Sequence, residues 1–161
     1  MKDELISIIE YGQKVGASYV EIRAQNISKT IISTKDGKVE VVTEGLEKGA
    51  GIRVLVNGAW GFATVGSLDA NSLKMAVEDA VKMAKAASEK VRMPVTLFDV
   101  KPVEDVVKIK PDIDPRDVSI DEKMDTVLRI DKTVFSYDER VKSCTISYAD
   151  ITGVQFFANS D

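Results

Sequence analysis

Few residues in this sequence could carry out chemistry, and the residue type that is missing is the most informative. The chain contains no histidine, so it cannot build a Ser-His-Asp or Cys-His nucleophilic site, an imidazole metal site or an HExxH helix. Its single cysteine, Cys144, lies on the apolar side of a predicted strand, where a free cysteine behaves as a small hydrophobe. We therefore predict no catalytic residue and no metal ligand in this chain. An active site built here would need carboxylates, lysine, tyrosine or serine.

Two further patterns are weak candidates for binding. Gly49-Ala50-Gly51 is similar to the start of a phosphate loop, but it precedes a strand pattern, whereas dinucleotide loops follow a strand and open a helix. A bulge or tight turn is the favoured interpretation. Asp112, Asp114 and Asp117 could gather oxygens around a divalent cation. Prolines on both sides instead favour a solvated turn.

Trp60 and Phe62 are the candidate contact residues. Trp60 is the only tryptophan and lies between Gly58 and Gly61, directly after a predicted tight turn. This position suits a residue that protrudes from a hairpin and contacts a substrate or a partner, together with the nearby Phe62. Packing in the core is the more common role of a large aromatic residue, and it stays open as the alternative.

The elements that position these residues follow from hydrophobic periodicity. A helix is predicted over residues 3–15, with Gly16 as its stop. Asp36-Gly37 and Asn57-Gly58 tolerate the positive φ angles of two-residue hairpin turns, which predicts an antiparallel meander. Ser67 or Asp69 can cap the helix that follows. Five segments have strand character: residues 20–25, 30–34, 39–43, 51–56 and 59–64. The second helix carries a broad apolar stripe: Leu73, Ala76, Val77, Ala80, Val81, Ala84 and Ala87.

The C-terminal part repeats the order of helix and strand. Ser119 and Glu122 have the spacing of a capping box ahead of a helix predicted over residues 119–135. Two strands follow, and the segments Val20–Gly37 and Cys144–Asp161 agree in alternation, which indicates a degenerate internal duplication. The second copy stops where its first hairpin should turn. Its last strand would therefore lack a partner, and we expect self-association through Gln155–Asn159.

The predicted fold class is α+β: helix, five-stranded mostly antiparallel meander, helix, then a degenerate second helix-strand-strand unit. All four prolines fall between residues 94 and 115, which predicts a connector of extended pieces. We divide the chain into an N-terminal α+β domain over residues 1–90, a connector over 91–117 and an incomplete second repeat over 118–161.

Composition narrows the function classes. The chain has 161 residues, 44% of them hydrophobic, which favours a globular protein. Its net charge of −4 argues against binding of nucleic acid that is driven mainly by electrostatic attraction. No apolar run is long enough for a membrane span, and the acidic N-terminus does not suit a signal peptide. The lone cysteine fits a reducing compartment, so we expect a cytoplasmic protein.

Four segments of the first 90 residues resemble the N-terminal region of the TldD/PmbA family. They are an Ala-x-Tyr-x-Glu strand at Ala17–Glu21, an Asp-Gly-x-Val-Glu hairpin at Asp36–Glu40, a glycine-led strand at Gly49–Val54, and Gly-Ala-Trp-Gly-Phe-Ala at Gly58–Ala63. The last run, with the Arg-Val-Leu-Val before it, is more similar to the TldD type. The family includes metallopeptidases (peptidase U62) that are also named modulators of DNA gyrase.

The resemblance implies a zinc-dependent peptidase acting on peptides, with zinc held by an HExxxH helix that lies beyond this chain. The chain itself would be the accessory domain that helps to enclose the substrate chamber and to form a homodimer or heterodimer with a TldD/TldE-type subunit. Alone it would bind no zinc and be inactive. Two alternatives stay open. One is a catalytically silent TldE/PmbA-type partner subunit. The other is a protein-binding regulatory module, a gyrase modulator, which a surface patch of basic or aromatic residues would favour. No direct contact with nucleic acid or a membrane is implied.

Overall fold

A computed structural model describes residues 2–160 and contains three α-helices, one short 3-10 helix and one four-stranded sheet in that range. The elements are α1 (Lys2–Lys14), β1 (Tyr19–Lys35), β2 (Lys38–Val56), β3 (Ala59–Val65), α2 (Ala70–Ser88), η1 (Pro115–Asp117), α3 (Ile120–Tyr137) and β4 (Thr145–Asn159). Two compact units share the long strands. Unit 1 comprises Met1–Asn26, Lys48–Val106 and Val154–Asp161, and unit 2 comprises Ile27–Glu47 and Val107–Gly153. The mixed α+β class is confirmed.

The sheet has the strand order β3-β2-β1-β4. Both predicted hairpin turns are confirmed, because Asp36, Gly37, Asn57 and Gly58 all have positive φ angles. β2 and β3 pair antiparallel, with Leu55 opposite Trp60. On the helix side of this pair Gly61 is required, because a Cβ there would lie 2.0 Å from the backbone oxygen of Ala80 in α2.

The prediction of five meander strands is wrong, because two pairs of predicted strands are each one continuous strand. Residues 25–29 contain neither glycine nor proline and include the buried Ile27, so β1 continues through them although the other four residues are polar. Gly45 and Gly49 lie inside β2. A Cβ at Gly49 would lie 2.6 Å from the Val65 carbonyl oxygen, so this glycine permits a close approach of β3 and does not end the strand.

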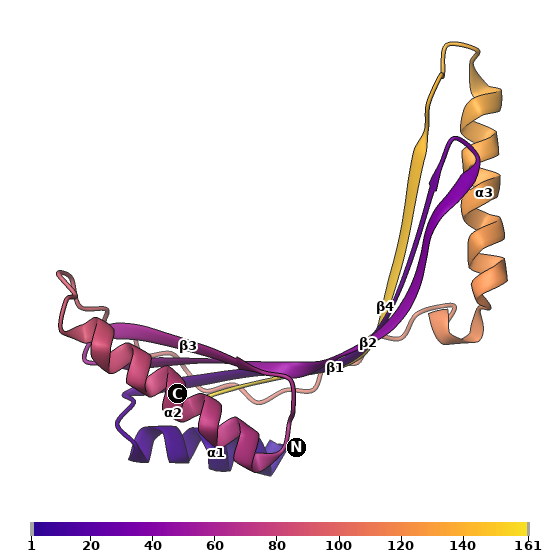
Figure 1. Cartoon of the computed structure of the whole chain (residues 1–161). Helices are drawn as coiled ribbons and strands as arrows, with labels where there is room; N and C mark the ends of the chain where they lie inside the picture. The colour runs from indigo at the N-terminus through magenta and orange to yellow at the C-terminus, as the bar shows by residue number, and fades with distance from the viewer. Residues whose placement is uncertain (1, 161) are drawn as a thin grey trace. The chain divides into compact units, whose positions relative to one another are not determined.

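Unit 1 has an apolar core between the sheet and two helices. Figure 1 shows α1 and α2 on the same face of this part of the sheet. Even-numbered residues of β1 and β2, such as Ile22 and Ile52, meet Ile8 of α1 and Leu73 of α2 in one cluster. The predicted α2 stripe is buried except for Ala87, and Asp69 is the N-cap, accepting from the backbone N–H groups of Asn71 and Ser72.

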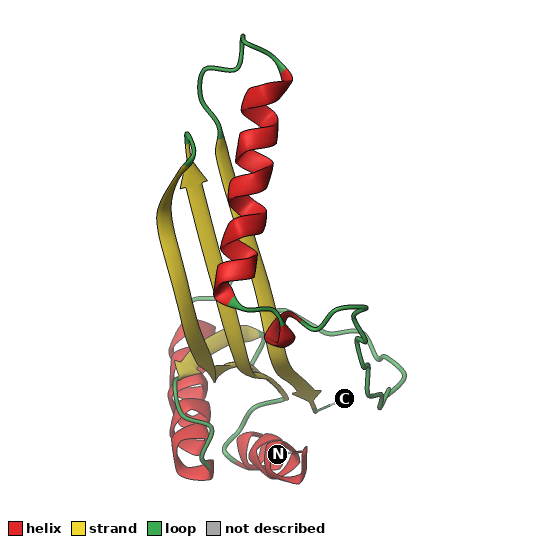
Figure 2. Cartoon of the chain, turned by 90° about the vertical axis from the view of Figure 1, so that its right-hand side faces the viewer, coloured by secondary structure: helices red, strands yellow, loops and turns green. Residues whose placement is uncertain are grey.

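Unit 2 consists of α3 against the remaining parts of β1, β2 and β4 (Figure 2). The predicted capping box between Ser119 and Glu122 is present at the start of α3. The buried hydrophobic residues of this unit are few: Ile27, Ile32 and Val127. Buried polar or charged residues outnumber them: Thr30, Thr34, Lys123 and Asp131.

The predicted strand pair at the C-terminus is wrong, because β4 is one strand, and so is the premise that it lacks a partner. β4 pairs with β1, and the hydrogen bonds from Ser160 N to Val20 O and from Asp36 N to Cys144 O make the pair antiparallel. Phe156 packs against the core of unit 1. The order helix then long strand does recur in α1–β1 and α3–β4. Because β4 already has β1 beside it, the expected self-association through Gln155–Asn159 loses its basis.

The segment between α2 and η1 has no regular secondary structure and is almost fully exposed. It begins beside the second hairpin, where the backbone N–H of Val95 donates to the carbonyl oxygen of Gly58. This behaviour agrees with the predicted connector. The three-part division into residues 1–90, 91–117 and 118–161 stays a prediction. In the range 2–160, no helix is both long enough and apolar enough to cross a membrane.

Candidate functional site

The sheet of unit 1 has a second face, opposite the helices, that carries aromatic and charged side chains. Side chains alternate along each strand, so when the even-numbered residues of β1 and β2 enter the core, the odd-numbered ones lie on the other side. β3 follows the opposite parity, because Gly61 faces α2. We call this surface the open face, and it consists of Tyr19, Glu21, Arg23, Gln25, Gly51, Arg53, Leu55, Trp60, Phe62, Thr64, Gln155, Phe157 and Asn159.

Glu21 is the centre of the open face. One carboxylate oxygen accepts from Arg23 Nε at 3.0 Å, and the other accepts from Arg53 Nη2 at 2.6 Å. The Tyr19 hydroxyl also donates to Glu21, at 3.1 Å. Burial raises the pKa of Glu21, but the hydrogen bonds from the two arginines and Tyr19 outweigh it and hold the pKa below its usual value. Glu21 is therefore ionised at neutral pH and holds both guanidinium groups in place.

Trp60 lies between a cation and another ring. Its ring is 4.6 Å from the Arg53 guanidinium carbon, in a cation–π contact. On the other side, Tyr19 meets it edge to face with ring centroids 5.9 Å apart. Trp60 is half-buried in this arrangement. It therefore belongs neither to the apolar core between sheet and helices nor to a freely protruding hairpin tip.

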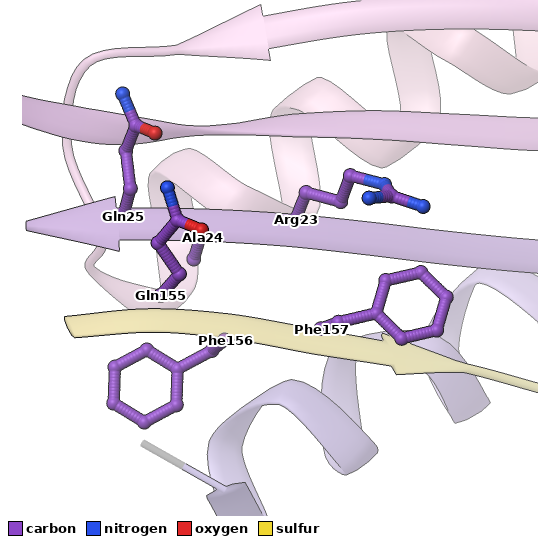
Figure 3. Close-up of a pocket in the computed structure, with 6 residues that line it drawn as sticks. All are labelled: Arg23, Ala24, Gln25, Gln155, Phe156 and Phe157. Atoms are coloured by element: carbon purple, nitrogen blue, oxygen red, sulfur yellow. The ribbon is translucent and has the colours of Figure 1, made fainter. Parts of the chain in front are cut away.

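A second cation–π pair borders a small pocket between β1 and β4. The guanidinium carbon of Arg23 lies 4.6 Å from the ring centroid of Phe157. The pocket has a volume of about 230 Å³ and is lined by Arg23, Ala24, Gln25, Gln155, Phe156 and Phe157. Figure 3 shows the Gln25 and Gln155 amides on one side of the two strands and Phe156 on the other. The pocket thus offers an amide pair, a guanidinium group and an aromatic ring.

The open face differs in charge from the whole chain. It carries two arginines and one glutamate, with no lysine and no aspartate, whereas the chain has a net charge of −4. The two arginine side chains are 71% and 48% exposed, while that of Glu21 is only 8% exposed. Within residues 2–160, the terminal nitrogens of Arg23 have no hydrogen-bond acceptor. The face is therefore a positive, aromatic surface on which guanidinium N–H groups are available to donate hydrogen bonds to a ligand.

Unit 2 contains the other group of perturbed side chains. Lys123 and Asp150 form an ion pair at 2.9 Å, with side chains only 7% and 12% exposed, and Tyr148 donates to Asp150 at 2.6 Å. Burial, followed by its contact with Asp150, raises the pKa of Tyr148 to about 12. Asp131 accepts from the Thr34 hydroxyl at 3.0 Å through one oxygen. Its other oxygen is buried with no hydrogen-bond partner in the described part of the chain. These contacts fix α3 on the sheet and engage the Tyr148 hydroxyl and the Lys123 ammonium group.

The remaining candidates from the sequence lie apart from the open face or take structural roles. Gly49-Ala50-Gly51 lies inside β2, so it forms neither the phosphate loop nor the turn that we considered. Asp114 caps the short helix η1 and pairs with Arg116, in agreement with a turn. Cys144 is half-buried just before β4, and burial, then Asp131 and Asp36, raises the pKa of its thiol. Across residues 2–160, no group of three or more histidine, cysteine, aspartate or glutamate side chains could hold a metal ion.

Of the predicted contact residues, both Trp60 and Phe62 lie on the open face, and Phe62 is exposed. Sequence reasoning missed Glu21, Arg23, Arg53 and Phe157. A usable signal was present, because Glu21 and Arg23 alternate with the apolar residues of β1. In the structure both helices cover the same face of this part of the sheet, so these charged positions share the other face.

Comparison with known proteins shows two consecutive family matches. The description "PmbA/TldA metallopeptidase domain 1" fits residues 20–84, and "PmbA/TldA metallopeptidase central domain" fits residues 113–161. The chain is 33% identical over 143 residues to a metalloprotease of Methanocaldococcus jannaschii, a match that covers 89% of this chain and 31% of that protein. It is 24% identical over 159 residues to a protein of Saccharolobus solfataricus named zinc metalloprotease TldD homolog, covering 98% and 33%. The chain spans about a third of the length of these relatives.

Two crystal structures share the fold. One is described as a modulator of a DNA gyrase from Thermotoga maritima, with a TM-score of 0.69, 18% identity, and coverage of 99% of this chain and 35% of that one. The other is TldE from Thermococcus kodakarensis, with a TM-score of 0.66, 19% identity, and coverage of 98% and 35%.

Proposed function

This chain belongs to the PmbA/TldD family, and from that premise we propose that it is the N-terminal accessory domain of a zinc-dependent peptidase acting on peptides. In this proposal it shapes the substrate chamber and takes part in a dimer with a TldD/TldE-type subunit, in the cytoplasm. The observation that carries the proposal is the pair of consecutive metallopeptidase-domain matches, at residues 20–84 and 113–161. Relatives named metalloprotease support it, since the chain aligns with about a third of their length.

Zinc does not fit the residues of this chain. A catalytic zinc site needs three protein ligands in fixed geometry. The chain has no histidine, and no cluster of three suitable side chains occurs between residues 2 and 160. We therefore assign no step of peptide hydrolysis to these residues. The proposal is that an HExxxH helix in another part of the full-length protein holds the zinc.

The open face is the surface by which this chain would contact a peptide. Trp60 and Phe62 supply apolar area, and Arg23 and Arg53 supply hydrogen-bond donors that are already held in position by Glu21. Such preorganised donors lose little conformational freedom on binding. Trp60 and Phe62 are thus proposed as contact residues and not as catalytic residues.

The test compares zinc content and peptide cleavage in the full-length protein and in residues 1–161 alone. We expect the full-length protein to retain about one zinc per subunit after dialysis and to cleave peptides, and the isolated chain to do neither. Chelation should abolish cleavage, and size-exclusion chromatography with light scattering should report a dimer. A full-length protein that cleaves peptides equally well with its zinc removed would contradict the proposal.

A second function is favoured by one observation. The open face is a basic and aromatic surface patch, the feature that favours a protein-binding regulatory module. A full-length protein that holds no zinc and cleaves no peptide, but binds a purified protein partner through Arg23 and Trp60, would favour this alternative. The third candidate is a catalytically silent TldE/PmbA-type subunit. The sequence encoded after Asp161 distinguishes it from the peptidase. An HExxxH sequence there would exclude it.

A further inference from the structure

We propose that the open face binds an extended acidic peptide, whose carboxylates contact Arg23 and Arg53 while its backbone lies over the aromatic side chains. This inference rests on the proposed peptidase function, because it names the class of substrate segment that this chain would hold. Four observations support it: the free guanidinium donors, the rigid mounting of both arginines, the extent of the face, and its charge relative to the rest of the chain.

Hydrogen-bond donors remain available because Glu21 accepts from only one nitrogen of each arginine. Arg23 donates to Glu21 through Nε, and Arg53 donates through one Nη. This leaves both Nη groups of Arg23, and the Nε and other Nη of Arg53, without a hydrogen-bond acceptor in residues 2–160. A planar guanidinium group binds a carboxylate through two parallel hydrogen bonds. Two positive groups shared with one carboxylate leave one unit of positive charge for a ligand.

Both arginines are held in place before a ligand arrives. Each is bonded to Glu21 on one side and stacked on an aromatic ring on the other, at 4.6 Å from Phe157 and from Trp60. Glu21 itself is anchored by Tyr19, which accepts from Asn159 at 3.3 Å. Long side chains usually lose much of their freedom on binding a ligand. Here most of that loss has already occurred on folding.

The size of the face favours a peptide over a single small carboxylate. Trp60 and Phe62 lie on β3 and Phe157 lies on β4, at the two ends of the strand order. With neighbouring strands about 4.8 Å apart, this distance is roughly 14 Å, which about four extended residues would cross. The Gln25 and Gln155 amides beside the pocket can pair with the N–H and C=O groups of a peptide backbone.

The positive charge of the open face favours an acidic peptide over other ligands. An acidic segment complements the positive face, and among the described residues of that face the only carboxylate is the buried one of Glu21. A polynucleotide is negatively charged, and the net charge of −4 on the chain as a whole would oppose its binding. A second copy of this chain, related by a two-fold axis through the face, would place the arginines of both copies together. The face is also rich in the residue types that dominate binding surfaces, tryptophan, tyrosine, phenylalanine and arginine.

The experiment measures binding separately from cleavage. Full-length protein without zinc is titrated into a fluorescein-labelled glutamate-rich peptide and into its glutamine counterpart, with anisotropy as the readout. We expect the glutamate peptide to bind at least about tenfold more tightly, as for a charge-assisted hydrogen bond, and its affinity to fall with added salt. Equal affinity for the two peptides would overturn the inference, even if the zinc-loaded protein cleaves both.

Variants assign the binding to this face. Arg23→Ala should weaken binding of the glutamate peptide about tenfold and leave binding of the glutamine peptide unchanged. Arg140→Ala, at another exposed arginine that pairs with a carboxylate, Asp138 in unit 2, is the matched control and should have no effect. Arg23→Glu should make a lysine-rich peptide the better ligand. Because Glu21 keeps its contacts with Arg53 and Tyr19, loss of Arg23 should leave the fold intact, which circular dichroism would verify.

Other occupants have distinct outcomes. If a single-stranded oligonucleotide of the same length binds more tightly than the glutamate peptide and loses affinity in Arg23→Ala, the face is a nucleic-acid site and the inference is wrong. If Arg23→Ala converts a dimer into monomers without changing peptide affinity, the face belongs to a subunit interface and the inference is again wrong. Binding of the acidic peptide by a protein that never cleaves it would support the inference and contradict the peptidase function.

Discussion

Unit 1 and unit 2 share three strands, yet they have opposite kinds of interior. Unit 1 buries a continuous apolar cluster between its sheet and two helices and places Glu21, Arg23 and Arg53 on the open face. Unit 2 has one α-helix, α3, and the centre of its interior is an ion pair and a buried aspartate, Asp131. Apolar burial is the main source of stability. A buried ion pair often contributes little net stability and mainly penalises alternative arrangements. The comparison indicates that unit 1 supplies most of the folding free energy, whereas unit 2 depends on correctly paired polar groups.

The largest expected effect is in the core of unit 1. Leu73 of α2 is 1% exposed within the apolar cluster. Leu73→Ala should lower the free energy of unfolding by about 3–5 kcal/mol, because it removes apolar contacts and leaves a cavity that rigid strands cannot fill. Urea denaturation followed by circular dichroism measures this loss. A change below about 1 kcal/mol would show that unit 1 is loosely packed and would remove the basis of the comparison.

Two valines provide a matched control for that experiment. Val77 of unit 1 and Val127 of unit 2 are both in helices and almost fully buried. Val77→Ala should cost more than Val127→Ala, because Val77 is enclosed by apolar atoms from several elements. Amide exchange should also be faster in the strand segments of unit 2 than in those of unit 1. Equal losses and equal exchange would mean that the two units unfold as one.

The next effect concerns the ion pair of unit 2. Lys123→Met should lower the free energy of unfolding by about 2–3 kcal/mol, because it leaves the carboxylate of Asp150 buried with only its hydroxyl donors. The double variant Lys123→Met/Asp150→Leu should recover most of this loss, since paired replacement by apolar groups is often neutral. Urea denaturation of both variants measures the difference. If the double variant is as unstable as the single one, the ion pair itself stabilises unit 2.

Local patterns predicted the parts of unit 1 that depend on neighbours in sequence. The first helix, both hairpin turns and the cap at Asp69 follow from spacing and turn chemistry over a few residues. The number of strands did not follow, because the mostly polar residues 26–29 and the segment 44–50 interrupt the apolar alternation. In the folded chain residues 26–29 lie in β1, which has β2 and β4 as its neighbours, and residues 44–50 lie in β2. The partner of β4 was also missed, because its pairing joins residues such as Val20 and Ser160, which are far apart in sequence.

The candidate site shows the same limit. Trp60 stood out because it is unique, and Phe62 because it is close to it. Glu21, Arg23 and Arg53 looked like ordinary charges on a strand. Their importance arises from cross-strand contacts, which bring Arg53 of β2 within 2.6 Å of Glu21 in β1. Only the register between strands, which no local pattern reports, shows that one carboxylate holds both arginines.

The smallest expected effect is the change in the free energy of unfolding with pH. Measuring it in variants of each unit shows how much of the loss of stability in acid comes from unit 1 and how much from unit 2. The pKa of Glu21 is lowered from the usual 4.5, because its hydrogen bonds with two arginines and Tyr19 outweigh the effect of burial. A carboxyl group whose pKa is lower in the folded state stabilises the fold above its unfolded pKa, and this contribution is lost as the pH falls through the folded pKa. Glu21→Gln should therefore be less stable than the wild type at neutral pH, and the difference should shrink as the pH falls below about 4.5.

The pKa of Asp150 is also lowered, so the double variant Lys123→Met/Asp150→Leu should show a similar reduction of pH dependence that originates in unit 2. Urea midpoints measured from neutral to acidic pH for the wild type and both variants separate the two contributions. If the stability difference between wild type and Glu21→Gln stays constant across this range, the pKa of Glu21 is the same in the folded and unfolded states, and the electrostatic description of the open face is wrong.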